Sequence, residues 1–244
     1  FAWSLTMFQN DDLDLIADAG ASVQHNPISN LKLGSGLAPV RAMLDRGINV
    51  ALGTDGCGSI ESVDMLRTLA SSVLLHTLRE GDPADWITPQ EAFRAATEGG
   101  AAALGRTDIG HISVGAKADI ALYDTRSIAF APLHDPLQQL TLAETGRALR
   151  HVVVDGDVVL RDGALTRIDE TDILGRIHEA AATLDPEIAK SEKSVERLRA
   201  PYEAIYRRCC EEPIPPDVIP ARVPRAPDPC RSAVRPANSD CKRA

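Results

Sequence analysis

An acidic side chain, Asp55, lies in a glycine-rich loop that directly follows a short apolar run, residues 50–52. An apolar run, a glycine loop and a helical pattern also outline a phosphate-binding loop, but that loop carries Lys followed by Ser or Thr. Here the loop continues as Cys57-Gly58-Ser59 without Lys, and the carboxylate would repel a phosphate. A metal ion or a transferred proton suits Asp55 better, while a structural role, in which Asp55 binds loop amides or caps a helix, stays open.

Three further polar residues, His25, Asn30 and Lys32, lie at or just after the end of another short apolar run. Taken one at a time, each is more often a hydrogen-bonding residue of its own loop than a contact for a ligand. Functional side chains gather, however, at the carboxyl ends of parallel strands. We therefore expect His25 and Asp55, at the ends of two successive strands, to face the same opening.

The elements that must position these residues alternate between strand and helix patterns. Strands are predicted over 21–24 and 48–53, and helices over 11–20, 39–46, 61–78 and 88–105. The last helix begins at Thr88-Pro89-Gln90-Glu91, which combines an N-cap Thr, an early Pro and a Glu at the third position. The alternation predicts parallel βα units. Two strands are too few for a closed (β/α)8 barrel, which typically takes about 250 residues.

The character of the chain changes after residue 105. Short β-type runs follow, and Asp155-Gly156 between two of them predicts a hairpin in a mostly antiparallel module. Residues 170–208 return to a helical pattern, and residues 211–244 are rich in proline, which predicts a disordered tail.

Charge and composition exclude several classes of protein. The formal net charge is −9, which disfavours a role in binding nucleic acid. No apolar run approaches the roughly 18–20 residues of a membrane span, and no signal-peptide pattern is present. We therefore expect a cytoplasmic protein that binds neither nucleic acid nor a membrane.

Four stretches in a fixed order resemble a known family: "HNPISNLKLGSGLAPV", "INVALGTDGCGS", "IGHISVGAKADIALYD" and "HVVVDGDVVLRDG". Together they are similar to the C-terminal half of the amidohydrolase superfamily, and in particular to its cytosine deaminase-like branch. That branch contains methylthioadenosine/S-adenosylhomocysteine deaminases, guanine-type deaminases and triazine chlorohydrolase-like enzymes. The resemblance covers about residues 1–168.

The resemblance implies an α/β fold with four parts. Residues 1–106 would be the C-terminal strands and helices of a metal-dependent (β/α)8 barrel, and residues 107–169 a small β-sandwich module. A helical extension would follow over 170–210, and a proline-rich tail over 211–244. Asp55 is implied to bind one Zn²⁺ or Fe²⁺ and to take a proton from metal-bound water. His25 and Asn30 are implied to lie near the substrate, His25 without binding the metal.

The implied reaction is hydrolytic deamination of a purine, pterin or related base, with dechlorination of a triazine-like ring as the alternative. The implied partner is therefore a small heteroaromatic substrate, and the full-length form is expected to be a homo-oligomer. The chain departs from the family pattern because it contains no His-x-His and begins with Phe1. We expect a piece of a longer protein that retains at most one metal ligand, does not retain the metal and is inactive alone.

Two other interpretations stay open. The chain would be a non-catalytic remnant if its missing ligands exist nowhere else. Alternatively it would be a β-rich interaction module with a helical, proline-rich tail. The acid in a glycine loop at the end of a strand argues against the second of these, because an interaction module has no need of it.

Overall fold

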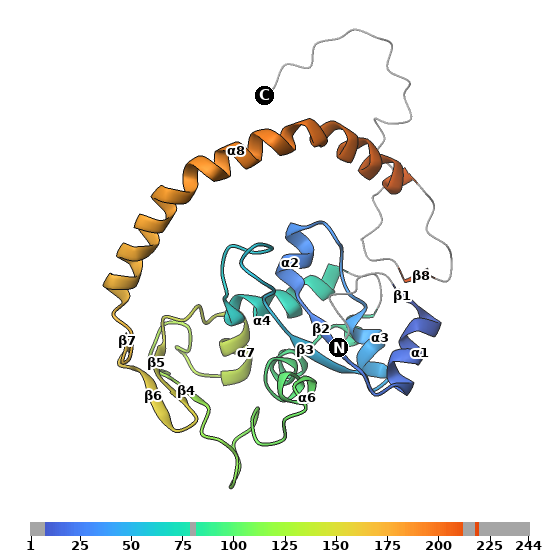
Figure 1. Ribbon diagram of the computed structural model, residues 1–244. Coiled ribbons are helices and arrows are strands. Elements are labelled where there is room, and N and C mark those ends of the chain that lie inside the picture. The colour runs from blue at the N-terminus through green and yellow to red at the C-terminus, as the bar shows by residue number, and fades with distance from the viewer. Residues whose placement is uncertain (1–7, 79–81, 212–217, 220–244) are drawn as a thin grey trace.

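The computed structural model describes residues 8–78, 82–211 and 218–219 of the 244-residue chain. Three parts can be followed in Figure 1: two parallel strands packed among helices, a four-stranded antiparallel sheet, and a long helix that arcs outside both. No helix of the described residues is long and apolar enough to cross a membrane.

The predicted parallel βα units are present. Strand β2 (Ser22–His25) pairs in parallel with β3 (Asn49–Leu52), in a register that sets Ser22 beside Asn49 and His25 beside Leu52. Helix α1 (Asn10–Asp18) precedes β2, and helices α2 (Pro27–Lys32) and α3 (Val40–Asp45) connect the two strands. This connection carries the chain from the end of one strand to the start of the next.

One face of the two strands packs against helices and forms the core. Val23 and Val50 on that face contact apolar residues of α1, α3 and the helices that follow β3. Side chains alternate across a strand, so Gln24 lies on the opposite face, where it is exposed. On this opposite face Gln24 is exposed, whereas Ala51 beside it in β3 is 5% exposed. The opposite face is therefore only partly open among the described residues. The buried residues of this core are Leu13, Val23, Ala38, Val40, Met43, Ile48, Val50, Leu69, Val73, Ile87, Ala92 and Ala95.

The helices after β3 differ in part from the prediction. The helix predicted over 61–78 begins later, as α4 (Met65–Leu74), because the Asp64 carboxylate accepts a hydrogen bond from the Arg67 amide and caps it there. A 3₁₀ turn, η1 (Leu75–Leu78), ends it, and a second, η2 (Pro83–Asp85), follows the undescribed residues 79–81.

The helix predicted over 88–105 is confirmed. It runs as α5 (Pro89–Arg94), a π-helical segment η3 (Ala95–Gly99) and α6 (Gly100–Ala103). Gly99 is required where this helix crosses β3, because a Cβ at that position would overlap the carbonyl oxygen of Val50. The Asn49 side-chain amide secures the crossing, since it donates hydrogen bonds to the Gly99 carbonyl at 3.0 Å and to Ser22 Oγ at 2.9 Å.

The start of α5 allows a direct test of stability. Thr88 Oγ1 accepts a bond from the Glu91 amide, and the Glu91 carboxylate accepts one from the Thr88 amide. We expect Thr88→Ala to lower the free energy of unfolding by about 1 kcal/mol, since it exposes an unpaired helix amide. Urea unfolding measures the change. Gln90→Ala, at an exposed position of the same turn, is the control, and an equal loss in both variants would contradict the capping role.

The predicted antiparallel module is a single four-stranded sheet in the order β4-β5-β6-β7. Asp155 and Gly156 both have positive φ, 50° and 86°, as a two-residue type I′ hairpin turn requires. The described residues contain no second sheet layer there, so a sandwich is not seen among them. Its strands are β4 (Ile120–Tyr123), β5 (Leu149–Val154), β6 (Asp157–Arg161) and β7 (Ala164–Leu165).

An unpredicted helix, α7 (Pro136–Leu142), lies between β4 and β5. It begins at Asp135, whose carboxylate accepts hydrogen bonds from two backbone amides of its first turn. α7 packs against α4 and α5. Helix α7, which lies within the predicted module 107–169, therefore belongs to the layer of helices that packs beside β2 and β3.

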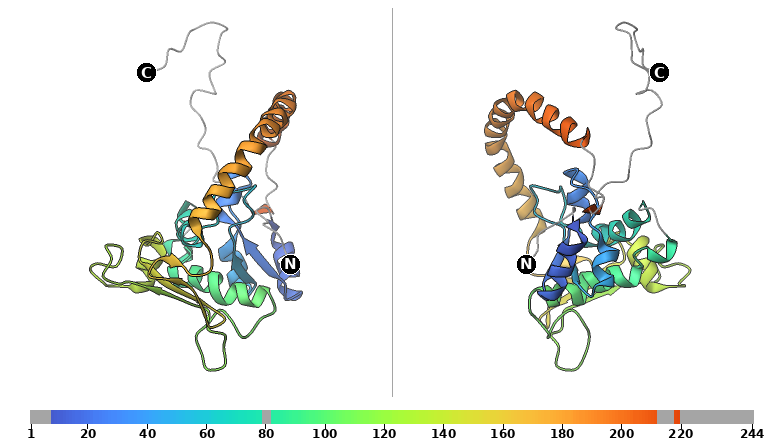
Figure 2. Two further views of the ribbon diagram at one scale, coloured as in Figure 1. Left: turned by 60° about the vertical axis from the view of Figure 1, so that its left-hand side comes forward. Right: turned by 90° about the vertical axis from the view of Figure 1, so that its right-hand side faces the viewer.

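The predicted helical extension is α8 (Glu170–Glu211), a helix of 42 residues with Pro186 and Pro201 inside it. Figures 1 and 2 show α8 as an arc that passes outside the other elements. Beyond it, β8 (Val218–Ile219) pairs antiparallel with β1 (Phe8–Gln9). The rest of the predicted proline-rich tail lies outside the described residues.

Candidate active site

Asp55 lies in the loop after β3, as predicted, and its own backbone makes the turn. Its φ is +66°, a left-handed conformation that non-glycine residues seldom adopt and that is concentrated at functional sites. Gly56 has open space where a Cβ would lie. At Gly53 a Cβ would overlap the ends of the Gln24 and Asn26 side chains, so these side chains would have to move to admit a larger residue.

Two hydrogen bonds fix the Asp55 carboxylate. Ser29 Oγ donates to Oδ2 at 2.7 Å, and the Gly56 amide donates to Oδ1 at 2.7 Å. These bonds, with Ser29 the largest contributor, hold the pKa of Asp55 below its ordinary value, and a weaker bond from Ser59 acts in the same direction. Asp55 is exposed. It is therefore an ionised, oriented carboxylate that faces the open side of the loop.

Helix α2 contacts the loop after β3 at two points, first through Ser29 and again through Lys32. Pro27 occupies its first turn, where a missing N–H costs nothing, and Ser29 on the next positions is 1% exposed. At the other end of α2, Lys32 Nζ lies 2.6 Å from the Glu61 carboxylate. The loop between Asp55 and Glu61 is thus attached to α2 at two points.

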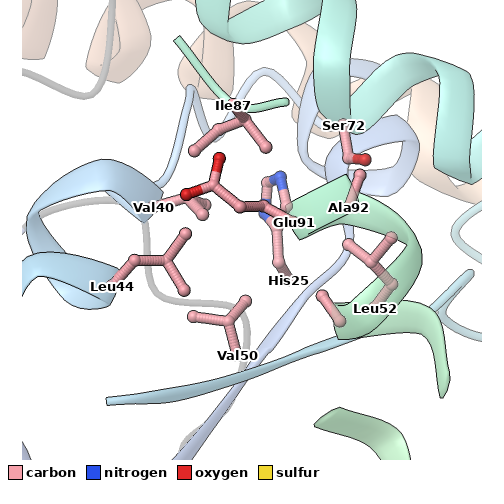
Figure 3. Close-up of a pocket in the computed structure, with 10 residues that line it drawn as sticks. His25, Val40, Leu44, Val50, Leu52, Ser72, Ile87, Glu91 and Ala92 are labelled. Carbon is pink, nitrogen blue, oxygen red and sulfur yellow. The ribbon is translucent and has the colours of Figure 1, made fainter. Parts of the chain in front are cut away.

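His25 lies in a different place from the one predicted. Its side chain is 1% exposed and lies on the helix-packed face of β2, where its Nε2 is 3.3 Å from Nε2 of His76. Figure 3 shows His25 in a small, mainly apolar pocket beneath α3 and α5, together with Ser72 and Glu91. The described structure brings Ser29, rather than His25, into contact with Asp55.

Asn30 is also buried, with 3% of its surface exposed. Its amide donates to the Asn26 carbonyl and its carbonyl accepts from the Ser35 amide, so its backbone connects both ends of α2. It is adjacent to Ser29 and therefore shapes the support of Asp55. Direct contact of His25 and Asn30 with a substrate stays a prediction.

Glu91 lines the same pocket as His25, and its carboxylate has a structural task. Burial, the largest single influence, raises its pKa, but hydrogen bonds from Thr88 and Arg41 together outweigh burial and lower the pKa overall. Its carboxylate lies 2.6 Å from Arg41 Nη2 and so ties α5 to α3.

A zinc site needs more ligands than the described residues bring together around Asp55. Catalytic zinc usually takes about three protein ligands and a water. Among residues 8–78, 82–211 and 218–219 no three His, Cys, Asp or Glu side chains gather closely enough to hold a metal ion. Asp55 offers one carboxylate, and nearby Asp64 is engaged as the cap of α4. The described residues therefore do not form a zinc site by themselves.

Known proteins resemble this chain both in sequence, including the Asp55 loop, and in fold. The sequence profile of the Amidohydrolase family matches residues 3–159. The chain belongs to the amidohydrolase family. Over 173 residues it is 42% identical to the 5-methylthioadenosine/S-adenosylhomocysteine deaminase of Halobacterium salinarum, a match that covers 71% of this chain and 40% of that protein.

Solved structures of the same family resemble this amidohydrolase chain. An adenosine deaminase from Xanthomonas campestris with bound zinc aligns with a TM-score of 0.70 and 33% identity, over 73% of this chain and 41% of that one. Atrazine chlorohydrolase from Arthrobacter aurescens, complexed with zinc, aligns with a TM-score of 0.65 and 32% identity, over 68% and 37%. The chain thus spans about two fifths of the length of the relatives that it matches.

The hydrogen bond from Ser29 allows the carboxylate itself to be tested. Because Ser29 is the main cause of the lowered pKa of Asp55, Ser29→Ala should raise that pKa toward its ordinary value. The bond stabilises the fold above the unfolded-state pKa, and that contribution is lost as the pH falls through the folded-state pKa. Carboxyl ¹³C NMR titration measures the shift.

The matched control is Ser59→Ala, since Ser59 is the weakest of the three hydrogen-bond donors to Asp55. We expect a smaller rise in the pKa of Asp55 in that variant. A Ser29→Ala variant in which Asp55 titrates as in the unmodified chain would show that α2 does not orient the carboxylate.

Proposed function

We propose that this chain contributes Asp55 to the active site of an enzyme that hydrolyses a C–N bond of an amino-substituted heteroaromatic ring. The favoured reaction is deamination of a purine, pterin or related base. The relatives named above as deaminases support this reaction class, and the geometry of the Asp55 loop is the observation that carries it.

The role proposed for Asp55 follows from its charge and orientation. An ionised carboxylate, held by Ser29 and Gly56 at the carboxyl end of a strand, is suited to bind a cation and to accept a proton. Zn²⁺ or Fe²⁺ would supply hydroxide at neutral pH by lowering the pKa of bound water to about 7. Since the described residues provide one such ligand, we propose that the chain alone retains no metal and is inactive.

We propose that the chain has the four parts predicted from its sequence. Residues 1–106, with β2 and β3, would belong to a (β/α)8 barrel, and residues 107–169 would form one layer of a small β-sandwich. The exposed Gln24 on the face of β2 away from the helices supports the first assignment, because each strand of a barrel turns one face toward the interior, which the further strands would enclose. Residues 170–210 would be the helical extension and 211–244 the tail.

His25 and Asn30 enter the proposal with distinct tasks. Asn30 would border the substrate pocket next to Ser29, on the support of the Asp55 loop. His25 would lie near the substrate, behind the residues that line the pocket, and would fix the end of β2 from the helix side through His76. The whole enzyme would be a cytoplasmic homo-oligomer acting on a small heteroaromatic molecule, with neither nucleic acid nor membrane as a partner.

Complementation tests the proposal directly. The chain is co-expressed with the part of the Halobacterium salinarum deaminase that lies outside the match, and the purified assembly is supplied with zinc. We expect ammonia release from 5-methylthioadenosine by the assembly and none by either piece alone. A stable, zinc-loaded assembly without activity on any of the candidate bases would contradict the proposal and favour a non-catalytic remnant.

Dechlorination is the alternative reaction that we propose, because the chain resembles atrazine chlorohydrolase in structure. Dechlorination of a triazine ring would use the same carboxylate, with chloride in place of ammonia as the leaving group. Measuring chloride and ammonia release from a chlorotriazine and from 5-methylthioadenosine in the same assembly separates the two reactions.

A further inference from the structure

Helix α8 carries a mainly apolar stripe, interrupted by Ser191, that the rest of the described chain leaves uncovered. Every side chain of α8 that the structure describes is exposed, and Leu184, Ile188 and Val195 are each at least half exposed. The stripe follows alternating steps of three and four residues over 36 residues. Its positions are Leu174, Ile177, Ala181, Leu184, Ile188, Ser191, Val195, Leu198, Tyr202, Ile205 and Cys209.

The spacing of the stripe indicates which kind of surface covers it. A strict seven-residue repeat has a period of 3.5, and a straight helix with 3.6 residues per turn drifts by about 20° per heptad relative to it. Over five heptads the stripe would turn by about 100° away from a flat protein surface. Another helix, wound around α8 as in a coiled coil, keeps contact with the stripe along its whole length.

The residues of the stripe point to a two-stranded coiled coil. With Leu174 as the first heptad position, the central part of the stripe has β-branched Ile188 and Val195 at first positions and Leu184 and Leu198 at fourth positions, with Ser191 between them. This central combination favours two strands, whereas Ile177 and Ile205, at fourth positions nearer the ends, do not add to that preference. With 42 residues, α8 is far longer than any other helix of the described part of the chain, and its side chains there are exposed, so the partner helix that this chain itself can provide is α8 of another copy. We propose that two copies of the chain associate through α8, as an antiparallel coiled coil.

Charges beside the stripe determine the orientation. In a parallel pair, Glu187 of each copy would lie opposite Glu192 of the other, which gives two repulsions. In an antiparallel pair with Ile188 opposite Leu198 of the second copy, Asp185 lies opposite Arg199 twice over. That arrangement exchanges the two Glu187–Glu192 repulsions for two Asp185–Arg199 attractions, and one repulsion remains, between the Glu192 side chains of the two copies.

The two prolines within α8 agree with the same antiparallel register. Pro186 lies on the side of the helix away from the stripe, and Pro201 lies at its flank. A proline inside a helix bends it. In the proposed register Pro186 of one copy lies within one residue of the level of Pro201 of the other. The bend at Pro186 in each copy therefore lies beside the bend at Pro201 in the other copy, and the curved helices stay in contact.

Sedimentation equilibrium of the full chain measures whether two copies associate through the stripe of α8. The unmodified chain should dimerise, and Ile188→Glu should weaken the dimer at least tenfold, because Ile188 and Leu198 form two central layers. The matched control is Ala189→Glu, which adds the same charge one residue away and outside the stripe; its dimer should be unchanged. Circular dichroism checks that both variants keep α8. A monomeric unmodified chain, or an equal effect of both variants, overturns the proposal.

Charge exchange tests the orientation separately. Asp185→Arg alone should weaken the dimer, and adding Arg199→Asp should restore it to within a few fold. Within one copy these two residues are about 21 Å apart along the helix, so the rescue can only pass between copies. A dimer in which the second exchange brings no recovery rules out the antiparallel register. This result is independent of the proposed enzymatic function, since α8 carries none of the residues assigned to it.

Discussion

Replacing Asp55 with Ala is expected to abolish ammonia release by the complemented assembly while leaving its folding intact. The side chain is exposed and its carboxylate accepts hydrogen bonds from Ser29 and Gly56 in the loop region, so its removal leaves no cavity in the core. In the role proposed for Asp55, a positioned proton acceptor contributes typically about 10²–10⁴ in rate, and loss of the proposed metal ligand would add to that. The turnover number and the zinc content of the assembly are measured together.

Asp55→Asn separates charge from shape in the same experiment. It keeps the size of the side chain but removes the negative charge, and we expect it to be nearly as inactive as the alanine variant. Asp14→Asn, which neutralises an exposed carboxylate on α1, is the control and should keep full activity. Activity that survives both substitutions at position 55 would assign Asp55 the structural role left open by the sequence.

The largest effect on stability is expected at Gly99. Because a Cβ there would overlap the Val50 carbonyl oxygen, Gly99→Ala must push η3 away from β3 or distort the strand. Overpacking of this kind typically costs about 1–3 kcal/mol, and here backbone rather than a side chain has to move. Urea unfolding of the chain provides the measurement.

The neighbouring residue provides a matched control for that substitution. Gly100 has nothing within 4 Å of the position that its Cβ would take. Gly100→Ala should therefore stabilise the chain by about 0.5–1 kcal/mol, as expected for Gly to Ala inside a helix. If both alanine variants unfold at the same urea concentration, close packing of η3 on β3 is not what fixes glycine at 99.

Local signals in the sequence were sufficient for most of the elements. Apolar runs bounded by glycine marked β2 and β3, Thr88 and Glu91 marked the start of α5, and Asp155-Gly156 marked the hairpin between β5 and β6. Each signal lies within a few residues of the element that it specifies. Where such a signal competes with periodicity, as Asp64 does at the start of α4, periodicity alone placed the boundary wrongly.

Two short helices were missed although their starting signals are present. Asn26-Pro27 precedes α2 and Asp135-Pro136 precedes α7, and in each case Pro occupies the first turn. Both helices are too short for a helical period to be recognised against their polar residues. Their stability comes from tertiary packing, which the sequence does not display.

The candidate site was predicted only as far as its own loop. Asp55 and its position after a strand follow from local pattern, but Ser29 lies 26 residues away and its bond to Asp55 is a product of the fold. The orientation of His25 depends on which face of a four-residue strand the helices cover. One residue of shift in register exchanges the faces, and so its burial beside His76 was not accessible from spacing.

The double attachment of α2 to the Asp55 loop limits how this segment can change in evolution. Ser29 and Lys32 both reach that loop, to Asp55 and Glu61. Inserting or deleting one residue within α2 would rotate everything after it by about 100°, and no single helix turn could then make both contacts. Substitutions at its exposed residue Leu31 should be tolerated in homologues. A change in the length of α2 should occur only together with a compensating change in the length of the loop.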